Sequence, residues 1–220
     1  MAEFFQDLGQ EWPALVAALK WTLVLSGSIT VSGGVGGLLL LFLLTQSSRG
    51  VQALANAFVT FFIGTPLLAL LFLMYYGLPT VGIDLSPFAA AFIGFTLNVS
   101  AYNARYLMSG YKAISRTELT AAQAMGYGRR QIFLVLILPQ SVRHAVPGLV
   151  SQAINNLKDS SVAFLIQFDG FLAFIQNFTS QNFMFFRGYA FAAVGYLLMV
   201  MLLTLAARQI QRRTRIPGFA

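Results

Sequence analysis

Polar and charged side chains lie inside apolar stretches of this sequence, where they could contact a polar molecule or carry charge through a membrane. Asn98, Tyr102 and Arg105 are spaced by four and three residues, which places them on one face of a helix. Lys158 and Asp159 are adjacent, so on a helix they point about 100° apart and each needs a partner elsewhere. Such groups could hydrogen-bond a polar cargo, relay a proton or form ion pairs between helices.

The depth of these side chains separates some of their roles and leaves others open. Asn98 falls near the middle of an apolar stretch and Arg105 near its end, where an arginine extends to the membrane surface. Asn98 is therefore the better candidate for lining a path. Lys158 falls in the outer half of a membrane, where an unpaired charge costs several kcal/mol. For Lys158 and Asp159, an ion pair with a neighbouring helix or subunit and a role in the path both remain open.

A basic stretch over 105–144 interrupts the apolar runs and contains the motif T-A-A-Q-A-M-G at 120–126, followed by L-I-L-P at 136–139. We expect Leu119, Ala122 and Met125 or Gly126 to form a small apolar face that a soluble partner could hold. Gly126 allows a sharp exit from a helix, and Pro139 limits how the next helix begins. The basic residues of the stretch are Arg105, Lys112, Arg116, Arg129, Arg130 and Arg143.

The composition predicts a membrane protein, because 57% hydrophobic and 10% charged residues leave too little polar surface for a soluble globule. The net charge of +7 comes from residues in loops and tails, which favours an effect of membrane topology over nucleic-acid binding. With no cysteine and a single histidine, His144, the sequence offers no disulfide, no thiolate metal site and no histidine cluster.

Apolar runs of about 20 residues can cross about 30 Å of hydrocarbon. We predict an all-α membrane protein with one domain over 1–220, a cytoplasmic loop over 108–142, and five spans over 22–44, 53–76, 87–107, 145–166 and 188–207. Loops rich in Lys and Arg stay in the cytoplasm, so Arg49, the 105–144 stretch and the tail with Arg208, Arg212, Arg213 and Arg215 lie inside. The acidic N-terminus lies outside and the C-terminus is cytoplasmic.

The fourth of these spans is the weakest, because 145–166 contains eight polar or charged residues. It would be tolerated only facing protein or water. The alternative is a re-entrant or interfacial helix in a four-span protein, which would place the basic loop and the basic tail on opposite sides. In the outer segment 168–186, Phe171, Phe174, Ile175 and Phe178 share a helical face. This face could lie in the membrane interface or dock an external partner.

Glycine and proline mark two places where helices pack or bend. Gly33, Gly34, Gly36 and Gly37 form a small-residue face that favours close helix packing over any role in a path. Gly64, Thr65 and Pro66 fall near the middle of the second span, where proline removes a backbone hydrogen bond. We predict a kink there, which could line a path or serve only the structure.

The central motif resembles the signature of the permease subunits of binding-protein-dependent ATP-binding cassette importers, which reads E-A-A, three residues, Gly, nine residues, I-x-L-P. Ala121, Ala122, Gly126, Leu138 and Pro139 match in register. Further segments resemble the polar amino-acid subfamily, and the resemblance covers about 19–213. These segments are 64–68, 97–98 with 101–102, 137–140 and 157–161.

The sequence departs from the family pattern at several positions. Thr120 stands where the family usually has Glu, Leu136 replaces Ile, and Ile63 replaces an Arg before G-T-P. In the third span the family has an A-E-x-x-R pattern, whereas this sequence has Arg105 after Ala104 in place of the Glu and Met108 in place of the Arg. These departures suggest a specialised half of a heterodimer. Arg105 in place of Glu also favours anionic over cationic cargo.

The resemblance implies the type I importer fold, in which a coupling helix between spans three and four sits in a cleft of a cytoplasmic ATPase. The coupling residues would be Leu119, Thr120, Ala121, Ala122, Met125 and Gly126. The sequence has no G-x-x-x-x-G-K-[ST] motif, so ATP and Mg²⁺ would bind the partner ATPase. A second permease subunit, an external binding protein and a polar amino-acid substrate complete the expected system, in a bacterial inner membrane. An ion-driven secondary transporter and a membrane scaffold for an ATPase are the alternatives.

Overall fold

The structure, a computed structural model, describes residues 2–214 and the side chains of residues 3–209. Every regular element in this part of the chain is a helix. Of the basic residues expected in the tail, Arg215 lies outside the described residues, as do the side chains of Arg212 and Arg213. The chain forms two compact units, and the one-domain organisation over 1–220 stays a prediction. Unit 1 is Met1–Thr30, Pro66–Phe95 and Ala153–Leu205, and unit 2 is Val31–Thr65, Thr96–Gln152 and Ala206–Ala220.

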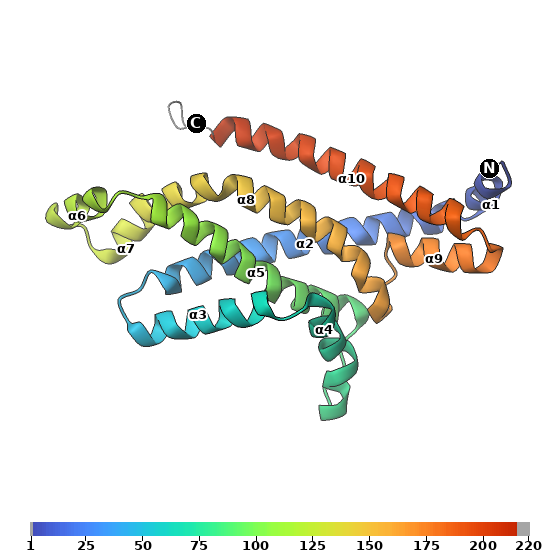
Figure 1. Ribbon diagram of the computed structural model, residues 1–220, viewed down its shortest axis with the longest axis horizontal. Coiled ribbons are helices and arrows are strands. Elements are labelled where there is room, and N and C mark those ends of the chain that lie inside the picture. Colours follow the sequence, from blue (N-terminus) through green and yellow to red (C-terminus); the bar gives the residue numbers. More distant parts are fainter. Residues whose placement is uncertain (1, 215–220) are drawn as a thin grey trace. The chain divides into compact units, whose positions relative to one another are not determined.

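Four long helices contribute residues to both units: α2 (Trp12–Leu44), α5 (Pro87–Ala113), α8 (Leu138–Asp159) and α10 (Phe185–Thr214) (Figure 1). Unit 1 also contains α1 (Ala2–Gln10), α4 (Leu67–Phe72), η1 (Leu73–Gly77), η2 (Leu78–Val81), η4 (Ser160–Ile166) and α9 (Phe171–Asn182). Unit 2 also contains α3 (Arg49–Gly64), α6 (Arg116–Ala124), α7 (Arg129–Ile132) and η3 (Phe133–Ile137).

The core of unit 1 is built around α9. Phe171, Ile175 and Phe178 are spaced by four and three residues, and this face is buried together with residues of α1, α2, α8 and α10. Ile175 is 0% exposed. The predicted helix within 168–186 therefore exists, but its apolar face is already covered by the chain's own core. Phe171, Ile175 and Phe178 are therefore not available to lipid or to an external partner, while Phe174 is half-buried.

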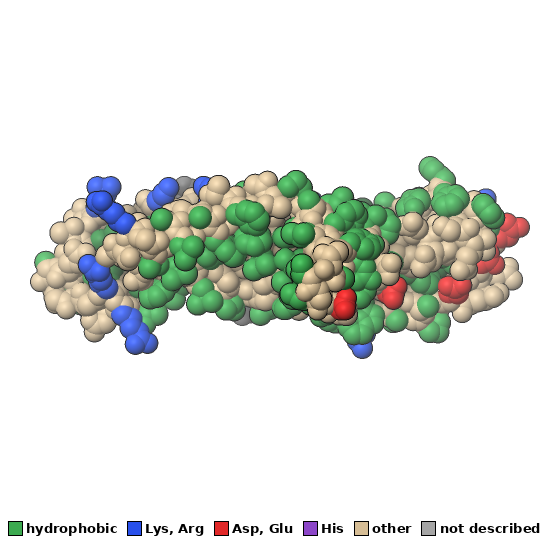
Figure 2. Space-filling model, turned by 90° about the horizontal axis from the view of Figure 1, so that it is seen from below, with side chains coloured by type: hydrophobic (Ala, Val, Ile, Leu, Met, Phe, Trp, Pro, Cys, Tyr) green, Lys and Arg blue, Asp and Glu red, His purple; other side chains and the backbone are tan. Residues whose placement is uncertain are grey.

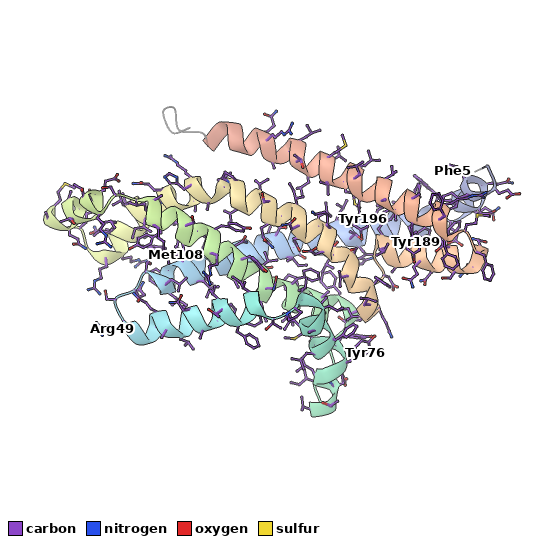
Figure 3. All side chains as sticks on the ribbon, in the orientation of Figure 1. Phe5, Arg49, Tyr76, Met108, Tyr189 and Tyr196 are labelled. Atoms are coloured by element: carbon purple, nitrogen blue, oxygen red, sulfur yellow. The ribbon has the colours of Figure 1, made fainter. Side chains whose placement is uncertain are left out.

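Hydrogen bonds join the ends of helices in unit 1. The Thr22 hydroxyl on α2 accepts from the backbone N–H of Phe171, the first residue of α9, at 2.8 Å, and so satisfies one of the free donors of a helix start. The Tyr76 hydroxyl on η1 donates to the Leu165 carbonyl oxygen at 3.1 Å (Figure 3). Both bonds hold the segments that follow α8 against the rest of the unit.

In unit 2, α3 folds back beside the second half of α2 (Figure 1), and Leu40 packs with Ala55 and Val59. Of the four glycines predicted to form a small-residue face, Gly33, Gly36 and Gly37 face α5, while Gly34 does not. A Cβ atom at Gly33 would lie 2.6 Å from Val99 Cγ1, and one at Gly37 would lie 2.6 Å from Asn103 Cβ. These distances confirm that the small-residue face serves packing, because only glycine lets the two backbones approach this closely.

Adding a methyl group at Gly37 should therefore destabilise unit 2. The new Cβ would also lie 3.3 Å from the backbone nitrogen of Ala104, which cannot move aside as a side chain can. We expect Gly37→Ala to lower the free energy of unfolding by about 1–3 kcal/mol. Gly34→Ala is the matched control, because nothing lies within 4 Å of its added Cβ. The two variants are unfolded in detergent, and circular dichroism measures the free energy of unfolding of each. Equal destabilisation would contradict the packing.

Within residues 2–214, three helical stretches are long and apolar enough to cross a membrane: Trp12–Leu44, Arg129–Ile166 and Phe185–Gln209. The bent pair of Arg49–Gly64 and Leu67–Val81 makes a fourth span if its two helices count as one. The helix α5 has 27 residues but is not in this set. The protein is therefore an all-helical, multi-pass membrane protein, and the count of five spans and their orientation stay predictions.

Candidate functional site

The segment with the T-A-A-Q-A-M-G motif forms a short helix, α6, whose two ends are set by its sequence. At the start, the hydroxyl of Ser115 accepts from the backbone N–H of Thr117 at 3.2 Å, which is the usual role of serine at an N-cap. At the end, Gly126 has a φ of 81°, a left-handed conformation that favours glycine. The N–H of Tyr127 donates to the Ala122 carbonyl oxygen at 3.1 Å, which closes the helix.

The apolar face of α6 that we predicted as a grip for a soluble partner is instead turned, through Leu119 and Ala122, toward the rest of unit 2. Ala122 is 8% exposed and packs with Ile114 and Ile132, and Leu119 lies against the same cluster. These two residues therefore anchor α6 in its own chain. Met125 is 70% exposed and remains available to a partner. The other exposed residues of the motif are Thr120, Ala121, Gln123, Ala124 and Gly126.

Contacts along α6 and α5 connect this segment to α8. The Gln140 amide nitrogen, in the first turn of α8, donates to Glu118 Oε2 at 2.9 Å. Ser141, the residue after Gln140, packs tightly on Gly110 of α5, so that a Cβ atom added at Gly110 would collide with the Ser141 backbone. α6 is therefore joined to α8 by a side-chain hydrogen bond, and α8 packs directly on α5.

The stretch 108–142, expected as a loop, is mainly helical, comprising the end of α5, then α6, α7, η3 and the start of α8. The helix that includes Pro139 begins upstream of it, at Arg129. Pro139 is the second residue of α8 and follows the π-helical turn η3 directly, so it lies inside this continuous helix and does not mark where the helix begins. Lys and Arg side chains gather around the end of unit 2 that carries α6 and α7 (Figure 2).

The helix breaks at Gly64, Thr65 and Pro66: α3 ends at Gly64 and α4 begins at Leu67. Pro66 has no N–H to donate to the carbonyl oxygen of Phe62, four residues earlier. The side-chain nitrogen of Asn98 donates to that oxygen instead, at 2.8 Å. Asn98 is 7% exposed, so its side chain is engaged in replacing the hydrogen bond that the proline removed.

The predicted path residues are divided between the units: Asn98, Tyr102 and Arg105 belong to unit 2, and Lys158 and Asp159 belong to unit 1. On α5, Tyr102 is half-buried and Arg105 is exposed. Lys158 and Asp159 are both exposed and lie where α8 ends and η4 begins. The charge of Lys158 attracts the neighbouring carboxylate of Asp159. Their position at a change of helix type leaves them accessible from outside unit 1.

Sequence reasoning missed a buried polar contact in unit 1. The Asn156 amide nitrogen on α8 donates to the Ser26 carbonyl oxygen at 3.0 Å and to Thr30 Oγ1 at 2.9 Å on α2. Asn156 is 1% exposed. A signal was present, because Thr22, Ser26 and Thr30 recur every four residues and therefore mark one polar face of an apolar helix.

Residues 33–216 match the family model described as "Binding-protein-dependent transport system inner membrane component". The chain is 38% identical over 159 residues to the probable amino-acid ABC transporter permease protein PatM of Vibrio harveyi, covering 70% of each chain. It is 30% identical over 213 residues to the putative glutamine transport system permease protein GlnP of Rickettsia conorii, covering 95% of this chain and 98% of that protein.

Two solved structures resemble the fold. A crystal structure of an amino acid ABC transporter with histidines has a TM-score of 0.86 and 25% sequence identity, with 95% of this chain and 98% of the other covered. An inward-facing structure of the MetNI methionine ABC transporter has a TM-score of 0.74 and 20% identity, with 94% and 99% covered. At that identity the second likeness concerns the fold alone.

Proposed function

This chain belongs to the family of inner-membrane components of binding-protein-dependent transport systems, and on that premise we propose that it is the permease subunit of an ATP-driven importer for a polar amino acid or a close derivative. The relatives named as a probable amino-acid permease and a putative glutamine permease cover 70% and 95% of this chain, which supports the substrate class. An ion-driven transporter is not favoured by these relationships.

The observation that carries the proposal is the construction of α6. It is a capped helix, anchored through Ala122 and Leu119 and tied to α8 through the bond between Glu118 and Gln140. Its outer face carries small side chains and the exposed Met125. A soluble ATPase could approach such a face closely and move the attached helices. ATP and Mg²⁺ would bind that partner, since this sequence lacks the phosphate-binding motif.

The assembly that fits the family contains two ATPase subunits, an external binding protein and a second permease subunit. The departures at Ile63, Arg105 and Thr120 favour a paralogue rather than an identical copy. The protein would lie in a bacterial inner membrane with its N-terminus outside and the basic end of unit 2 in the cytoplasm. Transport at full rate by this subunit with an ATPase alone, in the absence of a paralogue, would reject the heterodimer.

The path through the membrane would be lined by side chains that remain free to meet a cargo. Tyr102, Arg105, Lys158 and Asp159 meet this condition better than Asn98, whose amide nitrogen is already bonded. We propose that Asn98 preserves the helix break and thereby shapes the path indirectly. A break in a membrane helix exposes backbone groups that can be used at a path.

Reconstitution in proteoliposomes tests the function directly. The chain is combined with its permease partner, ATPase and binding protein, and uptake of radiolabelled glutamine and other polar amino acids is measured. The proposal expects uptake that needs ATP and stops with vanadate. Uptake that follows an imposed proton or sodium gradient without ATP would support the ion-driven alternative instead. Stable assembly with the ATPase but no uptake of any amino acid would support a scaffold.

A further inference from the structure

A cavity of about 380 Å³ lies in unit 2, at the end where basic side chains gather (Figure 2). The end of α2, the segment after it, α5, α6, α7 and η3 all contribute to its wall. The residues that line it are Phe42, Thr45, Gln46, Ser47, Tyr111, Leu119, Gln123, Arg129, Arg130, Ile132, Phe133 and Ile137.

The polar part of this lining suits a phosphate group. Arg129 and Arg130 bring two guanidinium groups, which match the oxygens of a phosphate in shape and charge. Thr45, Gln46 and Ser47 add hydroxyl and amide groups, and no carboxylate is present among the described residues of the lining. Two positive charges beside neutral donors, without a counter-charge in the same wall, favour an anionic ligand.

An apolar groove continues from this cavity along α2 and the helix that follows α7. The groove measures about 380 Å³ and is lined by Val35, Leu38, Leu39, Phe42, Arg130, Phe133, Leu134 and Leu138. Phe42, Arg130 and Phe133 belong to both walls. Arg130 therefore stands at the border between a charged cavity and an apolar groove. Both helices of the groove belong to stretches that can cross a membrane.

We propose that this composite site binds an anionic phospholipid, with its phosphate between Arg129 and Arg130 and an acyl chain along the groove. A free phosphate would use only the cavity and would leave the groove empty, whereas a lipid uses both parts. Basic pockets between membrane helices are suited to anionic headgroups on the cytoplasmic side. The cavity shares Leu119 and Gln123 with α6 but does not include Ala121 or Met125 of its outer face, and lipid binding can be measured without transport, so the inference does not rest on the transport function.

Native mass spectrometry of the full chain in detergent tests the proposal. The protein is titrated with phosphatidylglycerol or with phosphatidylcholine of the same acyl chains, and the lipid-bound fraction is measured. We expect tighter binding of phosphatidylglycerol. Losing each arginine should weaken it roughly fivefold, so Arg129→Gln with Arg130→Gln should remove most of the preference. Arg143→Gln is the matched control, because Arg143 is an exposed arginine of unit 2 outside both walls.

Additional variants and controls distinguish a bound lipid from a free phosphate or a second copy of the chain. Leu39→Gln in the groove should weaken retention of phosphatidylglycerol, while Val31→Gln, on the same helix outside the groove, should not. Circular dichroism melting verifies that the variants fold. Equal binding of the two lipids, displacement of the lipid by millimolar inorganic phosphate, or an undiminished preference in the double arginine variant would overturn the proposal. Loss of the bound lipid when the chain forms a dimer would also overturn the proposal, because it would mean that a second copy of the chain covers the groove.

Discussion

Replacing Ala121 with tryptophan should reduce ATP-driven uptake by at least about tenfold, because loss of one central interface contact often costs about 2 kcal/mol or more. Ala121 lies on the exposed side of α6, away from the anchoring Ala122. A bulky side chain there would hold a docked ATPase away from the helix. The chain itself should stay folded, since exposed substitutions usually change stability by about 0.5 kcal/mol or less.

The control for this variant is Ala121→Ser, which keeps the side chain small at the same position. Uptake and ATPase activity are measured in proteoliposomes, together with co-purification of the ATPase. The serine variant should transport nearly as well as the unmodified protein, while the tryptophan variant should lose both co-purification and uptake. If the tryptophan variant still imports its substrate at an undiminished rate, the outer face of α6 is not the docking surface.

Replacing Asn98 with leucine should lower the free energy of unfolding by about 1–3 kcal/mol, because it leaves the Phe62 carbonyl oxygen without its donor. This oxygen lost its helical partner to Pro66 and now accepts from Asn98 at 2.8 Å. In a membrane no water replaces the missing donor, which makes the loss more severe. Chemical unfolding of the purified protein in detergent measures the change.

A second substitution shows whether this is the cause. Thr65 and Pro66 are extended at the break, and Pro66→Ala permits a helix to run through it. In that helix the N–H of residue 66 donates to the Phe62 oxygen, so the leucine substitution should cost less in that background. A double-mutant cycle over the two sites should therefore give a coupling energy of about 1 kcal/mol or more. Additive effects would mean that Asn98 contributes through some contact other than the Phe62 carbonyl oxygen.

The sequence predicted two of the long helices and the C-terminal end of α6, because these depend on local signals. Apolar runs of sufficient length coincide with α2 and α10, and Gly126 marks the end of the short helix. The glycines at 33 and 37 were predicted to pack closely, and they do. In each case a property of the segment itself, such as the absence of a side chain, determines the structure.

Other features could not be predicted, because they depend on which neighbour a face meets. Leu119 and Ala122 form an apolar face that suited a foreign partner as well as the chain's own core, and the structure places that core against it. The same holds for Phe171, Ile175 and Phe178 of α9. Periodicity shows that a face is apolar but not what covers it.

The pairing of polar groups was equally hidden. Asn98 and Pro66 lie far apart in sequence, and only the fold brings the Asn98 amide nitrogen to the oxygen that the proline frees. The contact of Asn156 with Ser26 and Thr30 joins α8 to α2 over more than a hundred residues. The tertiary fold decides which polar faces of distant helices meet, and a single sequence does not reveal that pairing.

The most direct test uses the absence of cysteine in the natural chain. A single Thr120→Cys substitution places a thiol on the exposed face of α6, where a membrane-impermeant maleimide can label it. Labelling is compared in right-side-out and inside-out vesicles, with and without the assembled ATPase. We predict labelling only in inside-out vesicles and its suppression when the ATPase is bound. Labelling from the external side, or labelling that the bound ATPase leaves unchanged, would contradict the role of α6 as the cytoplasmic coupling helix.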